Sequence, residues 1–101
     1  MSAARPQPMV ALEQEVLDWR HRAFPTTREP VAIGDVARQG WNVMRGDLLL
    51  PVLLLKETAL ENNVETMRRF CERHGVELAP HGKTTMSPEI VARQLHAGAW
   101  A

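Results

Sequence analysis

Apolar residues recur at helical spacing in the second half of the chain and predict one long helix there. The members of this stripe are spaced four, three and four residues apart, and they are Leu60, Val64, Met67 and Cys71. The spacing places them on a single helix face, with Phe70 alongside, so we expect Met67 and Phe70 to be core residues. Gly75 follows the stripe, at a position where a glycine commonly ends a helix.

Polar residues predict how this helix begins and what stabilises its outer side. Thr58 and Glu61 have the spacing of a capping box, in which each side chain accepts a hydrogen bond from the other residue's backbone amide. Glu65 and Arg69 lie one helical turn apart, and we expect them to form an ion pair.

A second helix and two short strands complete the pattern in this half. Val76–Pro80 is predicted to be a short strand. Ser87-Pro88-Glu89 has the composition of a helix start, with a capping hydroxyl, a proline at the first helical position and an acidic residue in the first turn. We expect that helix to end at Gly98 and residues 99–101 to enter another strand.

The first half is less regular and predicts a helical extension. Residues 1–9 are rich in proline and small side chains, and we expect them to be disordered. Apolar spacing over residues 10–24 favours a helix that ends before Pro25–Pro30. Asp35 is expected to cap a short helix that ends at Gly40. The run Leu48–Lys56 is predicted to be a buried strand or extended segment.

The order strand, helix, strand, helix and start of a strand is typical of a parallel α/β architecture. Parallel strands need neighbouring strands and covering helices on both faces, and two or three strands cannot supply them. We therefore predict the N-terminal fragment of a larger parallel α/β barrel or sheet. Residues 1–47 would be an N-terminal extension, partly disordered and then helical, and residues 48–101 would be the start of the barrel.

Composition narrows the classes of function. Lys and Arg total 12, as do Asp and Glu, and the charges balance within each half, which does not support a nucleic-acid partner. The single cysteine, Cys71, excludes an intrachain disulfide and fits a reducing cytoplasm. The N-terminus lacks the apolar segment of a signal peptide, and the longest apolar run is far shorter than the roughly 20 residues of a membrane helix. We expect a cytoplasmic protein without a membrane partner.

The loop before the second helix holds the strongest candidate for chemistry. It contains Lys83, one of two lysines in the chain, the other being Lys56. Loops that follow parallel strands carry the catalytic groups of α/β proteins. A lysine amine can form a Schiff base, whereas a guanidinium cannot. A solvated loop lysine without a chemical role remains the alternative.

The neighbours of Lys83 admit several interpretations. Gly82-Lys83-Thr84 imitates the end of a phosphate-binding P-loop, but that motif requires a glycine where Glu77 stands. His81 is an acid–base group, a stacking group or an ordinary loop histidine. Ser87 is most simply a helix cap, although a hydroxyl at a helix N-terminus can also meet a phosphate. The cysteine and the histidines do not form a zinc pattern.

Four segments together resemble a known enzyme family. They are Leu50–Leu55, Asn62-Asn63-Val64, Pro80-His81-Gly82-Lys83-Thr84 and Ser87-Pro88. The family comprises D-threonine aldolase, D-serine dehydratase and amino acid deaminase, which are pyridoxal 5′-phosphate enzymes with an alanine-racemase-type (β/α)8 TIM barrel. The resemblance covers residues 40–101 and implies that the chain is an N-terminal fragment of such a barrel.

The resemblance also implies roles for single residues. In that family the lysine of a Pro-His-x-Lys-Thr motif forms the Schiff base with the cofactor, and the matching residue is Lys83. His81, Thr84 and Ser87 would contact the cofactor with it. A divalent metal is compatible with the full-length enzyme, but the resemblance places none of its ligands in this chain. By the same analogy Pro51–Leu55 belongs with another domain.

Members of this family commonly read Lys-Thr-His-Lys where this chain reads Lys83-Thr84-Thr85-Met86, a departure that favours the deaminase-like branch. The resemblance implies the N-terminal part of a lyase that acts on a small D-amino acid, as a D-serine- or D-threonine-type deaminase, dehydratase or aldolase. It suggests a homodimer for the full-length enzyme, and we expect the isolated 101-residue chain to be inactive. Two alternatives stay open: a small non-catalytic α/β module that binds a partner, and a pyridoxal-phosphate carrier of the same superfamily.

Overall fold

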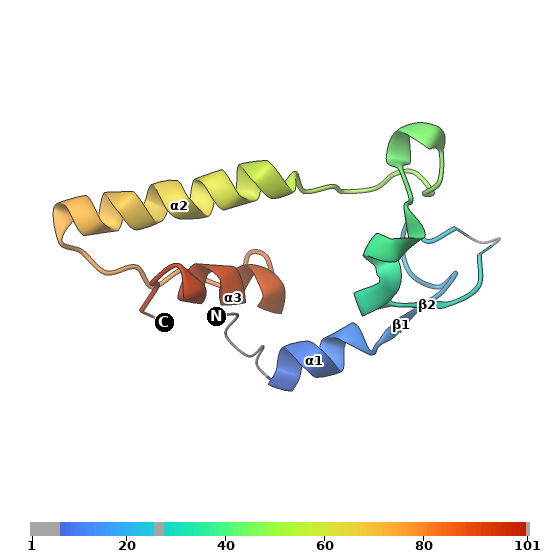
Figure 1. Ribbon diagram of the computed structural model, residues 1–101, viewed down its shortest axis with the longest axis horizontal. Helices are drawn as coiled ribbons and strands as arrows, with labels where there is room; N and C mark the ends of the chain where they lie inside the picture. The colour runs from blue at the N-terminus through green and yellow to red at the C-terminus, as the bar shows by residue number, and fades with distance from the viewer. Residues whose placement is uncertain (1–6, 26–27, 101) are drawn as a thin grey trace. The chain divides into compact units, whose positions relative to one another are not determined.

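The computed structural model describes residues 7–25 and 28–100, and the chain divides into two compact units, Met1–Leu53 and Leu54–Ala101 (Figure 1). The elements of the first unit are helix α1 (Gln7–Glu13), strands β1 (Val16–Leu17) and β2 (Val31–Ala32), and the 3-10 helices η1 (Ile33–Gln39) and η2 (Val43–Arg45). The second unit contains helices α2 (Glu57–His74) and α3 (Pro88–His96). None of the described helices has the length and apolar character needed to cross a membrane.

The first unit contains a two-stranded antiparallel sheet where apolar spacing predicts a long helix. Helix α1 ends at Glu13, and β1 then pairs with β2, with Val16 opposite Ala32 and Leu17 opposite Val31. The predicted helix over residues 10–24 is therefore wrong beyond Glu13. The disorder predicted for residues 1–9 is wrong for residues 7–9, which are helical, and residues 1–6 lie outside the described part.

Asp18 forms a turn directly after β1, within the range predicted to be helical. Its carboxylate accepts hydrogen bonds from the Arg20 backbone N–H at 3.0 Å and from the Arg20 guanidinium at 2.6 Å. Local bonds of this kind offer the backbone an alternative to the helix and favour a turn. The same hydrogen bonds from Arg20 hold the pKa of Asp18 well below its usual range. The turn therefore keeps an ionised acceptor at neutral and mildly acidic pH.

Phe24 is the centre of the first unit. Its side chain is 4% exposed, and Phe24 and Pro25 are the buried residues in the described ranges. Trp41 packs edge-on against Phe24, with ring centroids 5.5 Å apart and ring planes at 85°, a geometry that aromatic pairs favour. Phe24 and Trp41 therefore form an aromatic contact at the most buried side chain of this unit.

The short helix predicted to end at Gly40 is η1, and Gly40 has the left-handed φ of 64° that is common after a helix. The predicted cap is wrong, because Ala32 precedes the first helical residue and Asp35 lies in the first turn. The Asp35 carboxylate instead accepts a hydrogen bond from the Arg38 guanidinium at 2.8 Å.

The apolar run Leu48–Lys56 is not a buried strand. It pairs with no strand in the described ranges, and Leu50, Leu53 and Leu55 are 74%, 89% and 65% exposed. The buried-strand alternative is therefore wrong for this run, whereas the other alternative, an extended segment, is not contradicted.

Helix α2 confirms the apolar stripe and its end. Gly75 adopts φ 61°, and its N–H donates to the carbonyls of Cys71 and Glu72. The predicted capping box is wrong, because Lys56 occupies the N-cap position and makes no side-chain cap bond. Glu57 is the first helical residue, where the helix dipole favours a negative charge.

The prediction that Met67 and Phe70 are core residues is also wrong. Their side chains are 45% and 53% exposed. Phe70 packs against the His74 ring one turn further along the helix, at a centroid distance of 4.4 Å. Helical spacing identified the apolar side of α2, but it could not show how much of that side is covered.

The polar side of α2 holds a network of ion pairs. The predicted pair of Glu65 and Arg69 is confirmed at 2.8 Å, and Glu65 also accepts from Arg68 at 2.7 Å. Arg68 forms a second ion pair with Glu72. Hydrogen bonds from Arg68, and then from Arg69, lower the pKa of Glu65 to about 2.

We expect the stability of α2 to fall as the pH drops from about 4.5 to about 2, the range between the ordinary and the lowered pKa of Glu65. A carboxylate with a lowered pKa stabilises the folded state above its unfolded pKa and loses this effect as it is protonated. Helix content measured by circular dichroism should decline over this range. Glu65→Gln should reduce the decline, and an unchanged acid titration in that variant would contradict the prediction.

The segments predicted as strands at Val76–Pro80 and 99–101 form no ladder in the described residues. They do approach each other, because the Trp100 N–H donates to the Leu78 carbonyl at 2.7 Å. The helix between them begins as predicted, with Pro88 as its first residue and Ser87 as its cap. It ends at His96, two residues before Gly98, whose φ is 104°.

Candidate functional site: the lysine loop

Residues 81–87 connect Pro80 to α3, and we call this segment the lysine loop. Its centre is a closed turn, in which the Met86 N–H donates to the Gly82 carbonyl at 3.0 Å. Lys83 and Thr84 lie within this turn, and both are exposed. The Lys83 amine makes no hydrogen bond or ion pair with any described residue. The loop therefore presents an unpaired primary amine to solvent.

Thr85 joins the two ends of the turn. Its hydroxyl donates to the Gly82 carbonyl at 3.5 Å and accepts from the Ser87 N–H at 3.5 Å. Met86 has a φ of 49°, in the left-handed region that side chains with a Cβ seldom adopt. Three consecutive residues, Thr85, Met86 and Ser87, therefore supply the groups that close the turn on the C-terminal side of Lys83.

The end of the loop is anchored to α3. The Ser87 hydroxyl accepts from the Ile90 N–H at 3.4 Å, the N-cap bond that the sequence predicts. At the other end of the turn, a Cβ added to Gly82 would lie 3.4 Å from a methyl carbon of Val91. The loop therefore lies against the first turns of α3 at both of its ends.

The four site residues named from the sequence lie within this one short segment. His81, Lys83 and Thr84 are exposed, and Ser87 is half-buried. In the described ranges, no three His, Cys, Asp or Glu side chains gather in a way that could hold a metal ion. The sequence reasoning missed Thr85 and Met86, because a positive φ and a hydroxyl bridging two loop positions leave no spacing pattern to detect.

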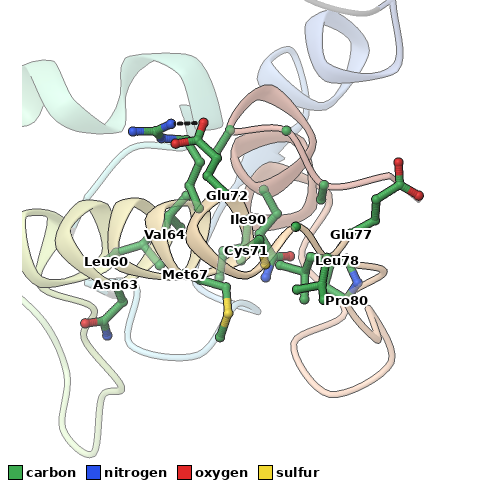
Figure 2. A pocket seen from close by; sticks show the side chains of 17 residues that line it. Leu60, Asn63, Val64, Met67, Cys71, Glu72, Glu77, Leu78, Pro80 and Ile90 are labelled. Carbon is green, nitrogen blue, oxygen red and sulfur yellow. Dashed lines mark hydrogen bonds and ion pairs between the residues drawn. The ribbon is translucent and has the colours of Figure 1, made fainter.

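The second unit also contains a cavity of about 530 Å3 (Figure 2). Lys83 does not line it. Leu60, Val64 and Cys71 of α2 line it together with Ile90 of α3. Figure 2 shows the Glu77 carboxylate pointing away from it. Pro80 lines the cavity, but none of residues 81–87 does, so the lysine loop and the apolar cavity are separate features.

Arg93 links the two helices of this unit. Its guanidinium donates to the Glu57 carboxylate of α2 at 2.6 Å and lies 3.8 Å from both Glu61 and Glu89. The hydrogen bond from Arg93 to Glu57, with the nearby carboxylates, raises the pKa of Arg93. Of these contacts, only the one to Glu89 has helical spacing. The contacts to α2 join residues far apart in the sequence, and their spacing in the sequence does not reveal them.

Comparison with known proteins gives one partial similarity. The chain is 38% identical over 69 residues to a D-threonine aldolase from Arthrobacter sp., a match that covers 68% of this chain. The matched region spans 18% of the length of that relative. No protein-family profile matches the chain. The similarity relates this chain to part of an aldolase, and so to an enzyme.

Proposed function

We propose that this chain is the N-terminal part of a pyridoxal-phosphate-dependent lyase acting on D-amino acids, with residues 48–101 beginning an alanine-racemase-type barrel. The observation that carries the proposal is Lys83, an unpaired and exposed amine at the centre of a closed turn before α3. The partial identity to a D-threonine aldolase supports it. The bond between Trp100 and Leu78 fits two neighbouring strands on either side of α3.

The residues of the lysine loop fit the proposed cofactor. Lys83 would hold it covalently through Nζ, which no described group occupies. His81 and Thr84 are exposed and available for contacts. The Ser87 hydroxyl accepts from Ile90 but keeps its own hydrogen to donate, at a helix N-terminus that favours anions.

Pyridoxal phosphate, when bound, supplies an electron sink for bond cleavage at the substrate Cα. The contribution of this chain is the Lys83 amine, which in its neutral form can take a proton from Cα or return one to it. A β-hydroxy D-amino acid is the proposed substrate class, losing either water or an aldehyde. The closed turn sets the backbone position from which the Lys83 side chain extends, and positioning of reacting groups is a large part of catalysis.

One observation favours a second candidate, a non-catalytic module that binds a partner. Large apolar side chains are exposed in both units, among them Met44 at 90% in the first and Trp100 at 71% in the second. A partner protein would cover such surfaces, as would further parts of a larger enzyme. A monodisperse chain that unfolds cooperatively would favour the module, whereas a chain that aggregates would favour the larger enzyme.

We expect the isolated 101-residue chain to form only a loose, sub-stoichiometric adduct with pyridoxal phosphate and to leave D-threonine and D-serine unchanged. Borohydride trapping followed by peptide mass mapping measures the adduct, and Lys56 serves as an internal reference because it is also an exposed lysine. We expect more adduct on Lys83 than on Lys56. Equal labelling of the two lysines would contradict the assignment of Lys83 as the cofactor site. A stable stoichiometric adduct with turnover would contradict the proposal that activity needs further parts of a larger enzyme.

A further inference from the structure

We propose that Thr85 is a positioning residue for Lys83. Its hydroxyl, together with the Gly82 carbonyl and the Met86 N–H, would close the turn that fixes where the Lys83 amine can reach. The inference rests on the proposed function, because it concerns how Lys83 meets the aldehyde of the cofactor. It adds a residue that neither the sequence pattern nor the partial similarity assigns.

Two of the hydrogen bonds that close the turn share one acceptor, the Gly82 carbonyl. The Gly82 carbonyl receives the Met86 N–H at 3.0 Å and the Thr85 hydroxyl at 3.5 Å. The Thr85 oxygen also accepts from the Ser87 N–H at 3.5 Å. Thr85 thus connects the carbonyl that precedes Lys83 to the residue that caps α3, and no other side chain in the described part of the loop bridges these two positions.

The backbone conformation of Met86 explains why the turn depends on the hydrogen bonds of Thr85. A φ of 49° at a residue with a long side chain is unfavourable by itself. Such conformations persist where surrounding contacts hold them, and they gather at functional sites. The contacts that hold Met86 are its own N–H bond to Gly82 and the two bonds of the neighbouring Thr85. Loss of the Thr85 hydroxyl should therefore let Met86 relax and the turn open.

The lysine lies between the bonded residues and has no contact of its own. Since Nζ makes no hydrogen bond or ion pair with a described residue, the turn acts on it only by setting where the Lys83 backbone lies and in which direction its side chain leaves. Opening the turn leaves the amine exposed and chemically intact but widens the range of positions it samples. Thr85 should therefore affect reactions that need a defined approach more than reactions that need only an accessible amine.

The test compares Thr85→Val, which keeps the shape and removes the hydroxyl, with Thr85→Ser, which keeps the hydroxyl. Thr66→Val on α2 is the matched control, because Thr66 is exposed and makes no hydrogen bond with a described residue. Three quantities are measured on the 101-residue chain. They are the hydrogen-exchange rate of the Met86 amide, the Lys83-to-Lys56 ratio of borohydride-trapped pyridoxal phosphate, and the same ratio after labelling with a small acylating reagent.

For Thr85→Val we expect Met86 exchange to be faster by up to about fivefold, the equilibrium equivalent of one ordinary hydrogen bond, because both Thr85 contacts are long at 3.5 Å. The trapped-cofactor ratio should fall by a similar factor and the acylation ratio should stay constant. Thr85→Ser and Thr66→Val should behave like the parent chain. Unchanged exchange and trapping in Thr85→Val would overturn the inference, as would a parallel change in both labelling ratios. A third outcome separates the proposals. If the parent chain traps cofactor equally on Lys83 and Lys56, the proposed function and the positioning role of Thr85 are both refuted. If Met86 exchange is nevertheless faster in Thr85→Val, the closed turn itself stands.

Discussion

Phe24→Ala should lower the free energy of unfolding of the first unit by about 3 kcal/mol, in line with aromatic truncations in protein cores. Phe24 is 4% exposed and packs edge-on against Trp41. Removing the ring takes away both the buried apolar area and the aromatic contact. Because small units have little stability to spare, we expect most of the variant's first unit to be unfolded in water. Tryptophan fluorescence during urea titration measures the change, since Trp41 lies at the site.

Phe70→Ala is the matched control, because Phe24 and Phe70 are the two phenylalanines of the chain. Phe70 is 53% exposed and contacts the His74 ring on its own helix. A half-exposed ring contributes less burial, so we expect a cost below about 1 kcal/mol. A loss from Phe24→Ala as small as the one expected for Phe70→Ala would show that the first unit is not organised around Phe24.

Lys83→Arg should remove most of the pyridoxal phosphate trapped on the two lysines of the chain, because Lys83 is expected to carry more adduct than Lys56. Arginine keeps the positive charge and much of the length, but a guanidinium stays protonated and does not form the covalent link that an amine forms. The turn around position 83 uses backbone atoms and Thr85, so this substitution should leave the loop unchanged. The amount of trapped cofactor on the lysine-containing peptides, measured by peptide mass mapping, is the readout.

Lys56→Arg provides the comparison for this experiment. Lys56 is the other lysine of the chain, is exposed and stands at the N-cap position of α2. Replacing it removes one amine without touching the lysine loop, so most of the trapped cofactor should remain. If the two variants lost equal amounts, the adduct would reflect amine exposure alone and Lys83 would have no special role.

The secondary structure predicted from the sequence agrees better with the structure in the second half of the chain than in the first, for a physical reason. The end of α2 and the start of α3 depend on local signals, because a cap or a glycine acts on the amides beside it, although the predicted cap of α2 is wrong. Ser87, Pro88 and Gly75 accordingly lie where the sequence predicts. In the first half the helical spacing over residues 10–24 competes with the Asp18 turn and with pairing to β2. The strand partner lies well along the chain, and periodicity within the segment carries no information about it.

In the candidate site, too, some features follow from the sequence and others only from the tertiary structure. The sequence determined the position of Lys83 in a loop before a capped helix, and with it the grouping of His81, Thr84 and Ser87. Only the tertiary structure showed that Met86 turns left-handed and that the Thr85 hydroxyl bridges Gly82 and Ser87.

Burial was likewise decided by tertiary structure. The sequence by itself determined the charge balance, the lysine loop and the apolar stripe of α2. It assigned Phe70 to the interior and offered a buried strand as one alternative for the run Leu48–Lys56, but Phe70 and most of that run are exposed, and Phe24 is buried instead. Hydrophobic spacing records which side of an element avoids water, whereas burial depends on whether another part of the folded chain reaches that side. Those contacts join residues distant in the sequence, and they exist only once the chain has folded.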